Sequence, residues 1–194
     1  METSGNLMTI KDTTSNPAPL GLLGFGMTTV LLNLHNAGLY ELNSMIIGMG
    51  IFIGGLAQVI AGVQEWKKNN TFGATAFTAY GFFWISLVTI WLLPRTAMGE
   101  GLKSSETAMG WYLLLWGVFT AGMFIGTLKL SRSLQVVFST LTILFILLAI
   151  SDFTGNKGIK VVAGVEGIFC GLSAMYACMG QILNEVYKKK VLPL

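Results

Sequence analysis

The chain offers few side chains of the kind that enzymes use for catalysis. Its single histidine, His35, has no cysteine or carboxylate at the spacing of a metal site or a catalytic triad. The sequence holds no phosphate-binding glycine loop, no HExxH and no GxSxG motif. We therefore predict no enzyme activity, no catalytic residue, no metal and no cofactor. We interpret His35 as a hydrogen-bonded residue at the end of an apolar segment.

Other reactive groups are equally sparse. Cys170 and Cys178 are eight residues apart in one apolar segment, which on a helix separates them by about 12 Å, too far for a disulfide. Glu166 is the one carboxylate clearly inside an apolar segment. Proton pumps and strongly coupled ion transporters usually place several ionisable side chains at that depth. A passage without them favours either a protonated small acid or an anion held by hydroxyl, amide and helix-end donors.

Hydroxyl and amide side chains can supply such donors without carrying a fixed charge. Thr28, Asn33 and Gln58 lie in apolar segments, and we predict that they contact the carboxyl group of a substrate. The alternative for each is a hydrogen bond to a neighbouring helix, because polar groups in lipid need partners inside the protein.

The composition indicates the solvent in which these residues lie. Hydrophobic residues make up 53% of the chain and charged residues only 11%, against roughly 25% charged residues in soluble proteins. The 24 glycines suit close packing of membrane helices. The net charge of +3 is spread over short basic clusters between apolar runs, so we predict no nucleic-acid partner.

The apolar runs predict an all-α, polytopic membrane protein with six spans in the lipid bilayer. We expect a tail over residues 1–16, a transmembrane domain over 17–186 and a second tail over 187–194. The first span contains prolines and glycines, so we expect it to be short or irregular. Capping side chains before the later spans are Asn43, Asn70, Thr107 and Ser131. The six predicted spans cover residues 17–33, 44–63, 72–93, 109–128, 134–150 and 161–182.

The distribution of lysine and arginine predicts the orientation. With an even number of spans, one side collects eight basic residues and the other four, so the positive-inside rule predicts that both termini are cytoplasmic. The richer side has Lys11, Lys67, Lys68, Lys129, Arg132, Lys188, Lys189 and Lys190, and the other has Arg95, Lys103, Lys157 and Lys160.

A GxFxG pattern recurs on the second, fourth and sixth predicted spans. It covers residues 50–54, 122–126 and 167–171, and each copy is also a GxxxG. Such glycines give a helix a flat face for tight crossing inside a bundle or between protomers. Whether the three copies reflect a true internal repeat stays open at this point.

The residues that open the first span carry a specific resemblance. Asn16, Pro17, Ala18, Pro19, Leu20, Gly21 and Leu22 form an NPAPLGL signature. The pattern continues through residues 24–29, 33–36 and 70–84, and with it the chain resembles the acetate uptake transporter family, the succinate–acetate permeases, from about residue 16 to Leu194. The resemblance implies six spans, cytoplasmic termini and a homo-hexamer in which each protomer surrounds its own central pathway.

The resemblance also implies which residues control passage. A narrow apolar neck would be formed by Phe25, Tyr80 and Leu141, and it would stop hydrated ions by dewetting. Phe25 lies on a stripe with Gly21, Thr28 and Leu32, and Leu141 on one with Leu134, Phe138 and Phe145, as helical spacing requires. Ala174 matches a position that selects among acids, and Glu166 departs from the apolar residue of similar bacterial proteins.

We therefore expect an inner-membrane carrier or channel for acetate, with succinate and other short carboxylates as further substrates. The choice between a channel and a proton symporter stays open. The first alternative is a channel for ammonium, urea or short amides. The second is a membrane receptor or scaffold without transport activity, which the short predicted tails argue against.

Overall fold

The computed structural model describes residues 14–194, and all regular secondary structure within that range is helical. Six helical segments are long and apolar enough to cross a membrane, which confirms the predicted fold class. Most of the predicted tail over residues 1–16 lies outside the described residues. The helices are α1 (Ala18–Asn36), α2 (Ser44–Gly48), the π-helix η1 (Met49–Ala57), α3 (Gln58–Lys67), α4 (Thr71–Leu92), the 3-10 helix η2 (Leu93–Arg95), α5 (Glu106–Thr127), α6 (Arg132–Thr154) and α7 (Lys157–Val186).

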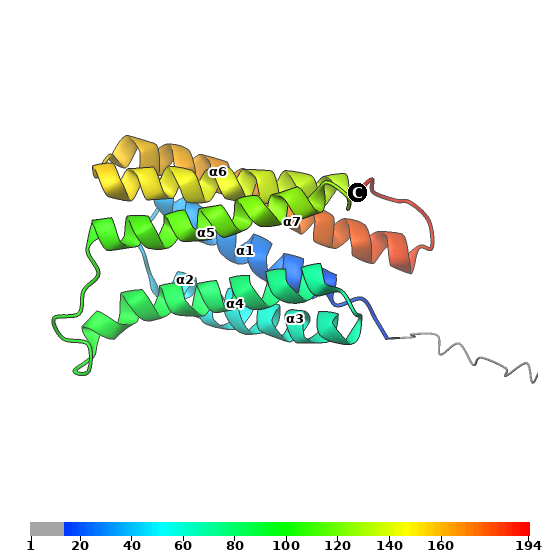
Figure 1. The fold of residues 1–194 in the computed structure, drawn as a ribbon, viewed down its shortest axis with the longest axis horizontal. Coiled ribbons are helices and arrows are strands. Elements are labelled where there is room, and N and C mark those ends of the chain that lie inside the picture. The colour runs from blue at the N-terminus through cyan, green and yellow to red at the C-terminus, as the bar shows by residue number, and fades with distance from the viewer. Residues whose placement is uncertain (1–13) are drawn as a thin grey trace, which may run out of the picture.

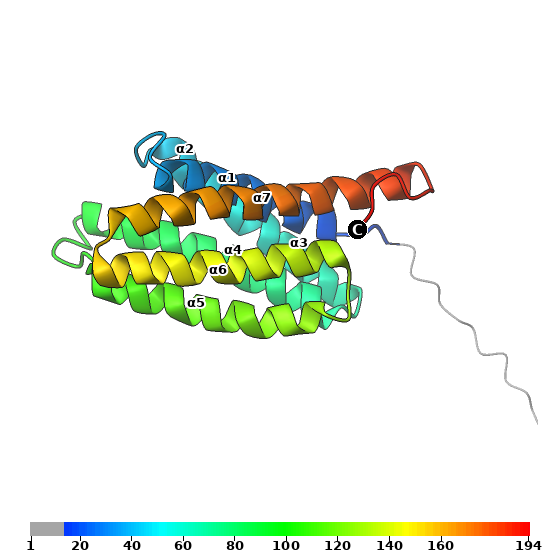
Figure 2. The same cartoon turned by 90° about the horizontal axis from the view of Figure 1, so that it is seen from above.

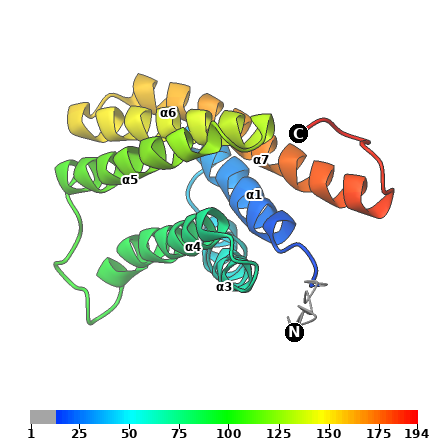
Figure 3. The ribbon, with the colours of Figure 1, turned by 45° about the vertical axis from the view of Figure 1, so that its right-hand side comes forward.

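The helices form a bundle in which α1 lies between two groups. It packs chiefly against α7 and also contacts α3 and η1, while α3 packs on α4 and α5 on α6 (Figures 1 and 3). Seen from above, α5, α6 and α7 run side by side (Figure 2). The start of α1 and the C-terminus lie at the same end of the bundle, where Asn16 donates a hydrogen bond to Gln181 at 2.8 Å.

The three GxFxG motifs pack to different degrees inside the protomer. A side chain added at Gly171 would approach the backbone oxygen of Gly26 to 2.7 Å, so the motif on α7 lets α1 and α7 touch directly. In η1, Gly54 packs against Thr28 and Trp84 in the same way. On α5, a Cβ added at Gly126 would lie 3.2 Å from the Phe72 ring, whereas one added at Gly122 would meet nothing within 4 Å among residues 14–194. The three copies therefore do not play equivalent packing roles.

The irregular span is the second one, so our expectation for the first was wrong. The prolines of α1 lie in its first turn, where no backbone hydrogen bond is lost, and the helix is regular from Ala18 to Asn36. The second span contains the nine-residue π-helix η1, whose run of glycines weakens ordinary α-helical propensity. A side chain at Gly24 of α1 would overlap the backbone oxygen of Ile53 in η1, so this glycine admits the widened turn.

Three of the four predicted caps are confirmed. The side chain of Asn43 accepts from the backbone of Met45, that of Asn70 from Gly73, and that of Ser131 from Leu134. The fourth prediction, Thr107, was wrong because α5 starts earlier: Ser105 has the extended backbone of a cap and accepts from Ala108 at 3.1 Å.

Aromatic side chains bridge α4 and α5, whose backbones make few contacts although the helices are consecutive in the chain. The Phe83 ring lies edge-on to Trp116 at 5.1 Å between centroids and stacks on Tyr112 at 5.7 Å. The Tyr112 and Ser86 hydroxyl groups share a 2.7 Å hydrogen bond across the same seam. Side chains therefore join the two helices where the backbones do not.

The loop after α1 is fixed by hydrogen bonds of the kind predicted for His35. Its Nδ1 lies 2.8 Å from the backbone oxygen of Tyr40, and because a carbonyl can only accept, the proton is on Nδ1. The Tyr40 hydroxyl group donates to the backbone of Leu31 at 2.5 Å, and burial raises the pKa of this hydroxyl above its ordinary value. The interpretation of His35 as a hydrogen-bonded residue at a span end is confirmed.

Candidate transport pathway

A small cavity lies inside the bundle where α1, α3, α4 and α6 meet. Its volume is about 20 Å³, which is room for roughly one water molecule. All but one of its lining side chains are hydrocarbon or aromatic. They are Leu22, Phe25, Gln58, Ala76, Phe77, Tyr80, Val137, Phe138 and Leu141.

The three residues of the predicted neck all line this cavity. Phe25 comes from α1, Tyr80 from α4 and Leu141 from α6, and each is buried. The rings of Phe25 and Tyr80 have centroids 6.2 Å apart at an angle of 50°. Helices far apart in the sequence thus bring these side chains to one point, while their part in transport stays a prediction.

The Tyr80 ring is held in one orientation by its surroundings. Its hydroxyl group shares a 2.9 Å hydrogen bond with the hydroxyl group of Thr120 on α5. Thr120 is completely buried and donates to the backbone oxygen of Trp116 at 2.7 Å. The rings of Trp116, Phe119 and Phe138 lie around the tyrosine at centroid distances of 5.9, 5.7 and 6.1 Å. The hydroxyl group is therefore engaged by α5.

Gln58 is the only amide side chain that lines the cavity. Its Nε2 donates to the backbone oxygen of Gly54 at 2.6 Å, whereas its Oε1 is buried without a hydrogen-bond partner among the described residues. Exchanging the two amide atoms would set two acceptor oxygens against each other, so the hydrogen bond fixes the orientation. The predicted contact of Gln58 with a substrate carboxyl group stays a prediction; in the structure its Nε2 is engaged by Gly54 and its Oε1 is an acceptor without a partner among the described residues.

The other predicted substrate contacts do not line the cavity. Thr28 is completely buried against Gly54, with its hydroxyl group 3.4 Å from the backbone oxygen of Met49. Asn33 donates to the backbone of Thr29 at 2.9 Å and accepts from Asn36 at 3.0 Å, so both ends of its amide are engaged. Ala174 on α7 is completely buried in the core. Their predicted contacts with a substrate remain untested.

Sequence reasoning missed most of the cavity's lining. Phe138 was on the helical stripe that includes Leu141, so its position could be read from the spacing. Phe77 could not, because its place depends on Gly21: a side chain at Gly21 would overlap the Phe77 ring. That contact explains the glycine of the NPAPLGL signature physically.

The GPR1/FUN34/yaaH family matches this chain over residues 3–193, nearly its whole length. The chain belongs to the GPR1/FUN34/yaaH family. This agrees with the predicted resemblance.

Relatives of this GPR1/FUN34/yaaH protein are named as transporters or channels. The succinate-acetate/proton symporter SatP of Escherichia coli (strain K12) is 56% identical over 180 residues, which cover 93% of this chain and 95% of that protein. Ammonia transport outward protein 2 of Saccharomyces cerevisiae is 38% identical over 168 residues, which cover 84% of this chain and 59% of that protein. A solved structure, described as that of the bacterial acetate channel SatP, is 54% identical in sequence and matches with a TM-score of 0.92. The match covers 94% of this chain and 99% of that chain. The chain is thus a multi-pass membrane protein with the fold of that channel.

The signature motif of this GPR1/FUN34/yaaH protein fixes the start of α1. The side chain of Asn16 accepts from the backbone of Ala18 at 3.1 Å while donating to Gln181 of α7, and Pro17 and Pro19 preset the first turn.

At the other end of the bundle, a hollow of about 360 Å³ lies among acidic and basic side chains, including those of His35, Glu41, Glu106, Asp152, Lys157 and Lys160.

Glu166 stands apart from both of these places. It lines neither the small cavity nor the hollow, and both of its carboxylate oxygens are buried without a hydrogen-bond partner among residues 14–194. The structure therefore does not link Glu166 to either of these two spaces.

Proposed function

We propose that this protein moves acetate and other short carboxylic acids, succinate among them, across the inner membrane, and that it is not an enzyme. The names of the SatP relatives support the substrate class. The observation that carries the proposal is the neck itself, a buried constriction lined by Phe25, Tyr80 and Leu141 with no charged side chain on its wall. Such a constriction selects by size and polarity.

The wall of the neck favours passage of the acid in its neutral form. An acetate anion would lose its hydration there and meet no cation, which costs far more than moving a neutral molecule. The acid's hydroxyl group can donate to the unpaired Oε1 of Gln58, an atom that would repel a carboxylate. A neutral acid carries its proton with it, so a channel of this kind and a proton symporter give the same net exchange.

The neck is closed to acetate in the present conformation. A cavity of about 20 Å³ holds roughly one water molecule, and acetate is larger. Side-chain rotation of Phe25 or Leu141 is the smallest change that would widen it, and such rotations need no rearrangement of helices. We propose that this motion admits each substrate molecule.

Ammonia transport is the second candidate. The yeast relative named for ammonia transport motivates it. Neutral ammonia is about as small as water, and its N–H groups could donate to the same Gln58 oxygen. The two candidate functions therefore use the same neck and differ in the solute that passes through it.

The orientation and the assembly are further parts of the proposal. We propose that both termini face the cytoplasm, which the excess of lysine and arginine at their end of the bundle supports. We also propose a homo-hexamer in which every protomer has its own pathway. The face of α5 at Gly122, where no described residue lies within 4 Å of an added Cβ, supports this assembly as a surface open for contact between protomers.

A competition assay in proteoliposomes tests the function. We expect uptake of labelled acetate to fall with added propionate or succinate and to be unaffected by urea and ammonium. We also expect the lumen to acidify as acetate enters, because the proton travels with the acid. Uptake blocked by ammonium, with no response to carboxylic acids, would favour the second candidate.

Breaking the hydrogen bond between Tyr80 and Thr120 should relax selection without stopping transport. Tyr80→Phe and Thr120→Val each remove this bond. If the bond positions the ring, each variant should raise the ratio of butyrate to acetate uptake about fivefold. The double variant should be no worse than either single variant, since both lose the same contact. Independent, multiplying effects would contradict the role of the bond in holding the ring.

A further inference from the structure

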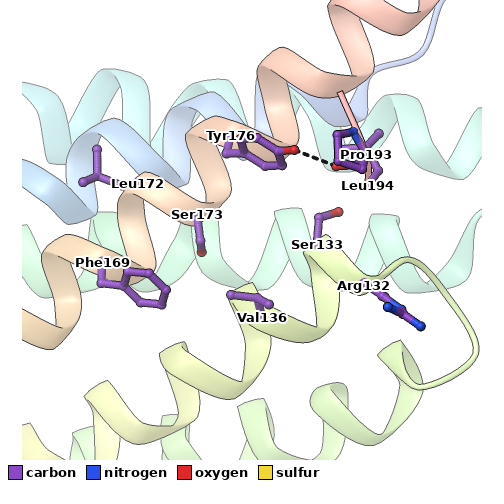
Figure 4. Close-up of a pocket in the computed structure, with 9 residues that line it drawn as sticks. All are labelled: Arg132, Ser133, Val136, Phe169, Leu172, Ser173, Tyr176, Pro193 and Leu194. Carbon is purple, nitrogen blue, oxygen red and sulfur yellow. Dashed lines mark hydrogen bonds between the residues drawn. The ribbon is translucent and has the colours of Figure 1, made fainter. Parts of the chain in front are cut away.

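The last residues of the chain fold back along α7 and are fixed there. The side chain of Asn184 donates to the backbone oxygen of Leu192 at 2.8 Å and accepts from the backbone of Val191 at 2.6 Å. Closer to the bundle, the hydroxyl group of Tyr176 donates to the backbone oxygen of Pro193 at 2.8 Å (Figure 4). Leu194 packs on Gly180, where an added side chain would lie 2.5 Å from it. The segment therefore forms a defined wall.

This wall closes one end of a groove between α6 and α7. The groove has a volume of about 540 Å³, far larger than the cavity in the neck, and Figure 4 shows its floor and rim. Val136, Phe169 and Leu172 form an apolar floor that is open to the outside of the protomer, with Phe169 58% exposed. A groove of this length and polarity on the perimeter of a membrane protein suits an acyl chain.

The rim of the groove is basic. Arg132 and Ser133 line it at the first turn of α6. The backbone N–H groups at the start of a helix have no acceptor within the helix, so they favour an anion. Lys129 lies in the same turn between α5 and α6. None of the groove's lining side chains, all within the described range, is acidic. A phosphodiester group would meet a guanidinium, a hydroxyl group and a helix N-terminus here.

The depth of these groups matches the layers of a bilayer. Helix α7 has 30 residues and is about 45 Å long, so it exceeds a hydrocarbon core of roughly 30 Å, and its end extends past the start of α6. Arg132 begins α6 at that end, and the apolar residues of the floor follow it toward the middle of the span. We therefore expect the charged rim at headgroup level and the floor at the level of the acyl chains.

We propose that this groove is a binding site for an anionic phospholipid of the leaflet that faces the chain termini. Its phosphodiester group binds Arg132 and the first turn of α6, and one acyl chain lies along Val136, Phe169 and Leu172. Free phosphate would leave the apolar floor uncovered, so the lipid is the occupant that accounts for both parts of the groove. The proposal is independent of which solute crosses the neck.

Native mass spectrometry of the full chain tests the site, with phosphatidylglycerol and phosphatidylcholine of identical acyl chains as probes. The wild type should prefer phosphatidylglycerol, and Arg132→Gln should weaken its binding about fivefold while leaving phosphatidylcholine unchanged. Arg95→Gln is the matched control, because Arg95 is also exposed but follows the end of α4, at the opposite end of the bundle from the start of α6. Ser173→Phe, which fills the groove, should weaken binding of both lipids.

Two results would overturn the proposal. One is equal binding of phosphatidylglycerol by the Arg132→Gln and Arg95→Gln variants. The other is that Ser173→Phe binds both lipids as the wild type does but forms a smaller oligomer, as measured by light scattering. The groove would then be a contact between copies of the chain. Arg132 is exposed, so its variant should fold even where Ser173→Phe does not, and it decides the matter alone.

Discussion

Replacing Leu141 with alanine should let acids longer than acetate through the neck. The side chain is buried and lines the cavity together with Phe25 and Tyr80, so its loss should widen the constriction that we propose selects by size. A hydrophobic site discriminates about tenfold or more for each methylene group that it rejects. We therefore expect the ratio of butyrate to acetate uptake in proteoliposomes to rise by at least about tenfold.

Leu144→Ala is the control for this change. Leu144 lies on the same helix and is buried to a similar degree, but it does not line the cavity. Both variants lose a buried leucine and should lose about 2–5 kcal/mol of stability. Only Leu141→Ala should alter selectivity. The same butyrate-to-acetate ratio in both variants, each shown to be folded, would remove Leu141 from the neck.

Gly171→Leu should prevent the protein from folding. At Gly171 even a methyl group would lie 2.7 Å from the backbone oxygen of Gly26, and a backbone atom inside a helix cannot move aside. The close contact between α1 and α7 would be lost, at a cost of more than about 3 kcal/mol, above the usual range for overpacking. Gel filtration in detergent should show aggregate, and Gly171→Ala should give folded protein with a lowered melting temperature.

Gly122→Leu provides the matched comparison on α5. It makes the same change in another copy of the GxFxG motif, at the first glycine of that copy, where an added Cβ would meet nothing within 4 Å among the described residues. This variant should fold with a melting temperature close to that of the wild type. If the proposed contact between protomers lies at this face, the particle size will fall while the helical content stays. Equal damage from the two leucines would contradict the packing described for α7.

Hydropathy was sufficient to predict the six spans, because lipid imposes a length and a composition on any helix that crosses it. The ends were less accurate. The sixth span was predicted over 161–182, whereas α7 runs from Lys157 to Val186, since polar residues beyond the bilayer core continue the helix without changing the apolar count. Caps were predictable where Asn or Ser directly precedes a span, as at Asn70 and Ser131.

The neck was predictable only through the resemblance. Nothing in the sequence states that Phe25, Tyr80 and Leu141 face the same point, because apolar stripes on membrane helices pack against neighbours as readily as they line a passage. The π-helix η1 could not be predicted from the sequence for another reason. Its widened turns depend on Gly24 of a different helix, and a contact of that kind has no local signature.

The aromatic seam between α4 and α5 makes one side of the neck compliant. Backbones in direct contact can separate only as rigid bodies, whereas rings such as Phe83 and Trp116 can tilt and slide over each other while every main-chain hydrogen bond is kept. Tyr80 belongs to this soft side through Thr120, and Phe25 to the stiff side, where glycines bring α1 and α7 together. We therefore expect any movement of helices during widening to be asymmetric: the wall near α5 yields, while the backbone of α1 stays in place and only side chains such as Phe25 rotate on it.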